Sequence, residues 1–131
     1  MIVLDASAAL YLLLRTPLAR IVEDRLLAAG ETLHVPHLID LEIAQALRRY
    51  VQSGAMTAAR GADALEVWRA FPLHRYPHEA LLARVWSLRP TLTAYDAAYI
   101  ALAEALAAPL LTTDAKLARA PGHVARVEVV G

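Results

Sequence analysis

The chain has 131 residues, no cysteine and a formal net charge of zero at pH 7. This length suits one compact domain, expected over residues 1–131, and the absence of cysteine excludes a disulfide framework and a thiolate metal site. Zero net charge is not typical of proteins that bind nucleic acid through overall charge alone. We expect a cytoplasmic protein without a membrane span, because no basic segment precedes an apolar run and the longest such run, residues 8–14, is far shorter than the roughly 20 residues of a transmembrane helix.

Short apolar runs alternate with segments of helical periodicity along the whole chain. In chain order, we expect a strand over 2–4, helices over 8–14 (capped by Ser7) and 18–29, a strand over 33–35, a helix from Pro36 to the residue before Gly54, a helix over 57–71, a strand over 73–76, helices over 77–88 and 95–107, a strand over 110–113, a short helix over 114–119 and a strand over 124–130. Strands separated by helices are typical of a parallel sheet with helices on both faces. The sequence therefore predicts a three-layer α/β/α domain with a central parallel sheet of four to five strands.

Two aspartates each follow an apolar strand directly and begin a helix. Asp5 lies in the segment IVLDAS and Asp114 in the segment LLTTDAK. Because ligands of open parallel sheets gather at the carboxyl ends of the strands, we expect both aspartates at the same edge of the sheet. Each also fits an ordinary role as a helix cap, so position alone leaves both interpretations open.

Two further acids of interest lie within expected helices. Glu42 has apolar residues one turn away on both sides, which predicts a half-buried carboxyl group without a local partner. Asp96 follows Thr93 by three residues, which is the spacing of a helix capping box. Asp40 points away from Glu42 on the same helix, and we expect it to be a solvated acid near the helix N-terminus.

Carboxylates that converge at one edge of a sheet repel each other, so they must either bind protons or share a cation. Mg²⁺ or Mn²⁺ suits a site that consists of oxygen ligands alone. Such an ion can activate water and neutralise the charge of a phosphodiester. If the four acids meet in space, the chemistry that follows is phosphodiester hydrolysis.

Four stretches in series resemble the PIN-domain nucleases, and in particular the VapC toxins of bacterial toxin–antitoxin pairs. They are MIVLDASAAL, VPHLIDLEIAQALRR, TAYDAAYIALAEAL and LLTTDAKLARA, and together they extend over nearly the whole chain. The resemblance implies a PIN-like fold and an endoribonuclease that depends on Mg²⁺ or Mn²⁺ and acts as the toxin of a type II toxin–antitoxin pair.

The same resemblance implies roles for particular residues. Asp5 and Asp96 would be the principal metal ligands, and Glu42 and Asp114 would complete the site directly or through water. It also assigns supporting hydrogen bonds to the hydroxyl groups of Ser7 and Thr112. Some members of the family carry a further acid shortly after the fourth one. Here Lys116 and Leu117 follow instead, which argues against a fully formed second metal site.

The implied partners are an RNA substrate, a second copy of the chain in a homodimer, and a VapB-type antitoxin in a toxin–antitoxin hetero-oligomer. The antitoxin's C-terminal segment would cover the active-site groove. Three arginines, Arg15, Arg48 and Arg49, are candidates for contacts with RNA phosphates, although each also fits a solvated helix face. The five histidines show no ligand pattern.

Two alternatives remain open from the residues alone. One is a PIN-like interaction module without catalytic activity. The other is a receiver-type signalling domain, which would also hold Mg²⁺ among acids but requires a late strand that ends in lysine, whereas the only lysine here is Lys116 within a short helix. A nucleotide-binding domain is disfavoured, because the first strand-to-helix turn, DASAA, contains no glycine.

Overall fold

The computed structural model describes residues 1–131, apart from the side chain of Ala29, and contains a five-stranded sheet in which all paired strands are parallel. The strands are β1 (Ile2–Leu4), β2 (Leu33–Pro36), β3 (Leu73–Tyr76), β4 (Leu110–Thr112) and β5 (Val127–Val129). The helices are α1 (Ala6–Leu13), α2 (Ala19–Leu27), α3 (Leu38–Gln52), α4 (Ala58–Arg69), α5 (Leu82–Ser87), α6 (Ala94–Leu106) and α7 (Ala115–Arg119), with 3-10 turns η1 (Ala28–Gly30) and η2 (Glu79–Leu81). The predicted parallel sheet of four to five strands is confirmed.

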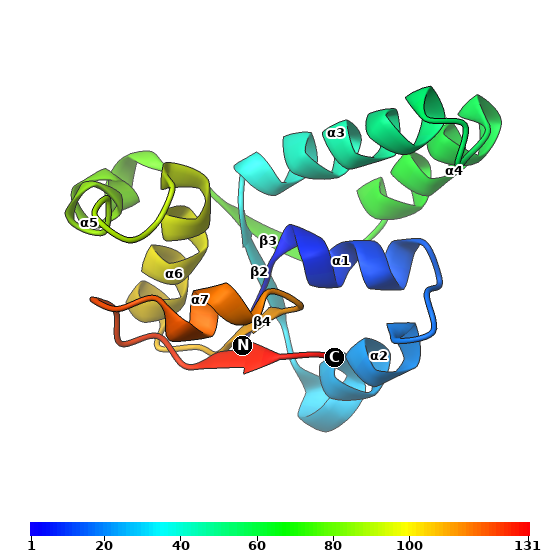
Figure 1. Ribbon diagram of the computed structural model, residues 1–131. Coiled ribbons are helices and arrows are strands. Elements are labelled where there is room, and N and C mark those ends of the chain that lie inside the picture. The colour runs from blue at the N-terminus through cyan, green and yellow to red at the C-terminus, as the bar shows by residue number, and fades with distance from the viewer.

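Helices lie on both sides of the sheet and form the predicted three layers. Figure 1 shows α5 and α6 on one side of the strands and α1 and α2 on the other, with the hairpin of α3 and α4 extending above α1. Every residue of α6 from 97 to 103 is buried, and the alanines among them let the helix approach β1, β2 and β4 closely. None of the described helices has the combination of length and apolar character that crossing a bilayer requires.

The strand order β3-β2-β1-β4-β5 determines where a site can form. The chain runs outward from β1 through β2 to β3, and then returns to the other side of β1 with β4 and β5. Such a reversal opens a crevice at the carboxyl ends of the two strands that flank it, here β1 and β4. The order also excludes a receiver-type domain, in which β1 lies between β2 and β3.

The helix ends show where local sequence signals were right and where they were wrong. Thr57 and Thr93 cap α4 and α6, as expected. The first helix, however, begins at Ala6 and is capped by Asp5 rather than by Ser7, because β1 ends at Leu4 and the chain turns directly into the helix. The predicted helix over 18–29 ends at Leu27 and continues as a 3-10 turn.

Asp40 lies in the first turn of α3 and its side chain is 42% exposed, as its position predicts, but it also has partners from other elements. Its carboxyl group accepts hydrogen bonds from the indole nitrogen of Trp68 at 2.8 Å and from two nitrogens of Arg75 at 2.9 and 3.1 Å. It therefore ties α3 to α4 and to β3. These partners are 28 and 35 residues away in the chain, so local sequence could not reveal them.

We predict that Asp40→Ala lowers the free energy of unfolding by about 1–3 kcal/mol at pH 7, because the buried indole N–H of Trp68 loses its acceptor. Burial raises the pKa of Asp40, but the hydrogen bonds from Arg75 and Trp68 outweigh it and hold the pKa below its ordinary value. The stabilisation is therefore present above the ordinary aspartate pKa and is lost as the pH falls below about 4. Denaturant unfolding of both proteins at several pH values measures the difference. Asp63→Ala on the exposed surface of α4 is the control, and an equal loss in both variants would contradict the prediction.

Candidate active site

Asp5 lies at the carboxyl end of the central strand β1, and neutral donors hold it in place. Its Oδ1 accepts hydrogen bonds from Ser7 Oγ at 2.6 Å and from the Ala8 N–H at 3.0 Å, and its Oδ2 accepts one from Thr112 Oγ1 at 2.5 Å. The residue is only 6% exposed. Burial raises the pKa of Asp5, while the hydrogen bonds from Ser7 and Thr112 act in the opposite direction. The carboxyl group is thus oriented without a cation beside it.

The two hydroxyl groups connect Asp5 to the segment that follows β4. Ser7 Oγ accepts a hydrogen bond from the Thr113 N–H at 3.0 Å, and Thr112 Oγ1 accepts one from the Asp114 N–H at 3.0 Å. Asp114 in turn caps α7, since its Oδ1 accepts a hydrogen bond from the Lys116 N–H at 2.9 Å. Residues more than 100 positions apart in the chain are therefore held at one edge of the sheet.

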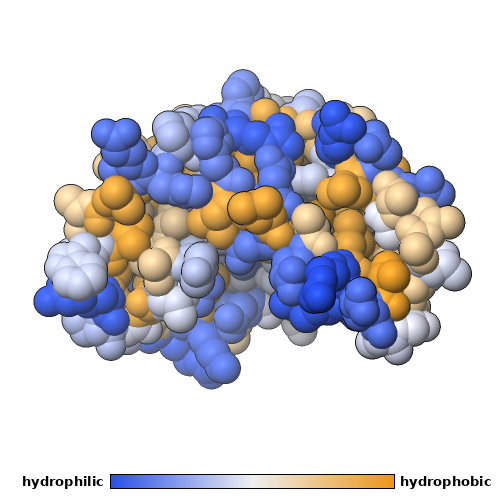
Figure 2. All heavy atoms as spheres, turned by 90° about the horizontal axis from the view of Figure 1, so that it is seen from above, coloured by the Kyte–Doolittle hydropathy of each residue, from blue (hydrophilic) through white to orange (hydrophobic). Residues whose placement is uncertain are grey.

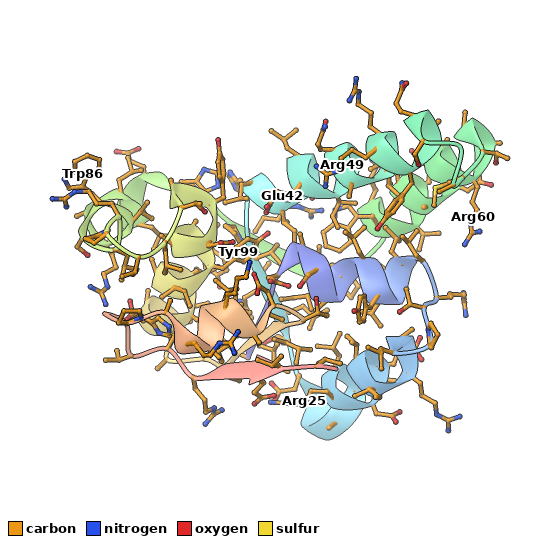
Figure 3. All side chains as sticks on the ribbon, viewed as in Figure 1. Arg25, Glu42, Arg49, Arg60, Trp86 and Tyr99 are labelled. Atoms are coloured by element: carbon orange, nitrogen blue, oxygen red, sulfur yellow. The ribbon has the colours of Figure 1, made fainter. Side chains whose placement is uncertain are left out.

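Glu42 enters the site from α3 and has a partner that the sequence analysis missed. Tyr99, on α6, donates a hydrogen bond from its hydroxyl group to Glu42 Oε1 at 2.5 Å, and Figure 3 shows the two residues on these neighbouring helices. Burial raises the pKa of Tyr99 far above its ordinary value, so the hydroxyl group stays protonated and acts as the donor. Burial also raises the pKa of Glu42, and the charges of Asp5 and Asp96 raise it further. The spacing in the sequence could have indicated this role, because Tyr99 lies one helical turn after Asp96 and therefore shares its face of α6.

Asp96 completes the set from the first turn of α6, where the Thr93 hydroxyl group caps the helix. Burial raises the pKa of Asp96, and the charges of Asp114 and Asp5 raise it further. The charges of Asp5 and Asp96 thus act on Glu42, and those of Asp5 and Asp114 act on Asp96, so these acids lie within electrostatic reach of one another near the carboxyl ends of β1 and β4. None of the ion pairs among the described residues involves any of the four.

The chemistry of this donor set fits a hard divalent cation. It consists of carboxyl oxygens, three of the four carboxyl groups have raised pKa values, and none of the four forms an ion pair among the described residues. Among the described side chains, no three acidic or histidine groups are arranged so that they could hold a metal ion as they stand. Hydrogen bonds from Ser7, Tyr99 and the N–H of Lys116 engage the individual carboxyl groups instead.

The three candidate arginines lie in different places. Arg49 borders a hollow of about 340 Å³ that Glu42 also lines. Arg48 faces the junction of α3 and α4, and Arg15 lies at a groove near the amino ends of β2 and β3. Of the three, only Arg49 lies beside one of the four acids.

We predict that Asp96→Asn makes the metal-free protein more stable at pH 8, by roughly 0.5 kcal/mol, because it removes one of several repelling charges. The folded-state pKa of Asp96 is raised, so the ionised form costs folding free energy at high pH and the protonated form does not. The gain should therefore shrink as the pH falls through the raised pKa and vanish below the ordinary one. Thermal unfolding in EDTA from pH 8 to pH 4 measures it, with Asp63→Asn as the control. A variant that is less stable than the parent at every pH would refute the prediction.

Comparison with known proteins identifies the family to which the chain is similar. The PIN domain family matches residues 2–123 of the chain. VapC ribonuclease Mb0985 of Mycobacterium bovis is 51% identical over 117 residues, which cover 89% of this chain and 88% of that protein. Ribonuclease VapC12 of Mycobacterium tuberculosis is 42% identical over 130 residues, which cover 99% of each. The crystal structure of VapBC2 from Rickettsia felis, bound to a promoter DNA fragment, has the same fold, with a TM-score of 0.73 and 18% identity over the full length of both chains.

Proposed function

The chain belongs to the PIN-domain family, and from this we propose that it is an endoribonuclease that acts as the toxin of a type II toxin–antitoxin pair in the cytoplasm. The observation that supports this most strongly is the set of acids near the β1–β4 crevice, in which the charges of Asp5 and Asp96 act on Glu42 and those of Asp5 and Asp114 act on Asp96, without an ion pair to any of the four among the described residues. Relatives with 40–51% identity over most of the chain carry the name ribonuclease. We propose a divalent cation, Mg²⁺ or Mn²⁺, as the cofactor.

Asp5, Glu42, Asp96 and Asp114 would hold this cation. When bound, it makes a nearby water molecule more acidic and offsets the negative charge of the phosphodiester. Asp5 supplies a carboxyl group whose orientation Ser7 and Thr112 set in advance. Hydrolysis joins the oxygen of this water to phosphorus and breaks one phosphorus–oxygen bond, while Glu42 takes the proton that the water loses and the leaving oxygen takes a proton from solvent.

Glu42 is the best candidate in the chain to accept the proton of the attacking water. Its carboxyl group enters the site from α3, half-buried and without an ion pair among the described residues. Tyr99 holds one oxygen of Glu42 by a hydrogen bond and leaves the other oxygen available. Tyr99 therefore serves as a positioning residue for Glu42.

The alternative of an inactive interaction module is less consistent with the site. A module that does not bind metal gains nothing from four crowded carboxyl groups, since their repulsion and burial cost folding free energy. Replacement of any one by a neutral side chain would relieve that cost. The presence of all four supports a catalytic role.

We predict that the purified protein cuts single-stranded RNA when Mg²⁺ or Mn²⁺ is present and stops when EDTA is added. Asp5→Asn and Asp96→Asn should each lower the rate on the order of 100-fold or more, because each removes a charge that stabilises the transition state through the cation. Tyr99→Phe should lower the cleavage rate less, by about tenfold, and should shift the pH–rate profile to higher pH. Gel analysis of a labelled RNA measures the rates, with circular dichroism to show that the variants fold. Cleavage that persists in EDTA would rule out the metal assignment. So would a cleavage rate that is unaltered in both Asp5→Asn and Asp96→Asn.

A partner surface lies at the opposite edge of the sheet from the acids. A groove of about 670 Å³ runs between α1, α2 and α4, near the amino ends of β2 and β3. It is mainly apolar, and Leu27 and Val67 in its lining are 79% and 52% exposed. We propose that an apolar segment of a VapB-type antitoxin packs here and that the antitoxin's C-terminal segment reaches the acidic site. The solved relatives include VapBC complexes from Rickettsia felis and Salmonella typhimurium.

We predict that Leu27→Glu weakens binding of the antitoxin at least tenfold, because it places a charge against an apolar segment. The rate of RNA cleavage by the free toxin should not change, since Leu27 is remote from the acids. Ile21→Glu is the matched control, because Ile21 is also exposed on α2 but does not line the groove. Calorimetric titration with the antitoxin measures both affinities, and equal affinities for the two variants would contradict this assignment.

A further inference from the structure

A hollow of about 340 Å³ opens between α3 and the start of α6, directly beside the acidic site. It is lined by Leu38, Leu41, Glu42, Gln45, Arg49 and Tyr95. The first five lie on one stripe of α3, because spacings of three and four residues return to the same face of a helix. Tyr95 faces them from α6.

The hollow adjoins the acidic site through Glu42. This residue lines the hollow, and its carboxyl group accepts a hydrogen bond from Tyr99 on α6, the helix that also carries Asp96. Tyr95 directly precedes Asp96 in the first turn of α6. A group that occupies the hollow would therefore lie beside the bond on which the acids act.

The side chains of the hollow offer three different contacts. The ring of Tyr95 is 67% exposed and presents an aromatic face for stacking. Arg49 is exposed and forms no ion pair among the described residues, so its guanidinium group is available to a phosphate. The amide of Gln45 can both donate and accept hydrogen bonds.

We propose that this hollow binds one unpaired base of the RNA next to the phosphodiester that is cut. Tyr95 stacks on the base, Gln45 binds its edge, and Arg49 contacts an adjoining phosphate. Single-stranded RNA is recognised through such contacts, because its unstacked bases expose both their faces and their edges. The inference rests on the proposed ribonuclease function and names the residues that select the position of the cut.

The charges of the hollow favour RNA over a protein segment as its occupant. An apolar protein surface would bury Arg49 and Glu42 without satisfying both, which is costly. Figure 2 looks onto the α3 side of the molecule and shows hydrophobic patches interrupted by strongly hydrophilic side chains.

The test uses the full chain and an oligoribonucleotide that the parent protein cuts at one position. A series of strands, each lacking one base, is titrated in Mg²⁺ against the Asp96→Asn protein, so that cleavage does not interfere. We expect removal of one particular base beside the cut to weaken binding about tenfold. In the double variant that combines Asp96→Asn with Tyr95→Ala, the intact strand should bind about as weakly as the strand without that base binds to the Asp96→Asn protein. Removal of the base should then weaken binding to the double variant no further. Tyr95→Phe keeps the ring and should behave like the parent.

Arg49 has its own measurement. For Arg49→Gln, the slope of log affinity against log salt concentration should become shallower by about 0.7, which corresponds to one phosphate contact with a single strand. Arg60→Gln is the matched control, because Figure 3 shows Arg60 at the far end of the α3–α4 hairpin from Glu42. In the otherwise unsubstituted protein, Tyr95→Ala should raise KM and move or broaden the cleavage position, with little change in kcat.

Three results separate the possibilities. If the parent protein cuts no RNA, the proposed function fails. If it cuts RNA but Tyr95→Ala leaves the effects of base removal unchanged, the function stands and the base-binding hollow is refuted. If Tyr95→Ala instead converts a dimer to a monomer in light scattering and weakens all strands equally, a second copy of the chain covers the hollow and the proposal is wrong.

Discussion

Repulsion between carboxyl groups at the carboxyl ends of β1 and β4 is the constraint on which the rest of the site depends. The fold holds Asp5 there with two hydroxyl groups and a backbone N–H, none of which carries a charge. It holds Glu42 with the hydroxyl group of Tyr99. Neutral donors orient the carboxyl groups but leave their negative charge unbalanced. The arrangement thus retains affinity for a cation, which an arginine in the same place would abolish.

Several acids outside the site have a cationic partner. Hydrogen bonds from arginines or from the amino terminus lower the pKa values of several glutamates remote from the crevice: Glu31, Glu104 and Glu128. Arg25, which pairs with Glu128, lies between α2 and β5 and far from Glu42 (Figure 3). These three glutamates therefore have cationic partners, whereas none of the ion pairs among the described residues involves the four acids of the site. Such a separation is typical of a functional site, because a fold gains no stability from unpaired buried charge.

Much of the site could be predicted from the sequence because its backbone positions follow from strand endings. Asp5 and Asp114 come where apolar strands end, and parallel strands place those endings at one edge. Tyr99 was missed, because its role depends on the packing of α6 against α3, which periodicity alone does not specify. The partners of Asp40 could not be predicted for the same reason, since Trp68 and Arg75 reach it from distant segments. The three arginines looked alike in sequence, yet only the packing of α3 beside α6 distinguishes Arg49 from the others.

The sequence by itself determined the alternation of strands and helices, the parallel sheet and the family resemblance, because these follow from local periodicity, helix caps and short motifs. Only the tertiary structure decided the strand order, which places the crevice between β1 and β4 and excludes a receiver-type fold. It also decided which acids remain without a cation and which hollow adjoins them. Contacts between residues 57 to 107 positions apart build this site, and their energies depend on packing and burial that no local pattern records.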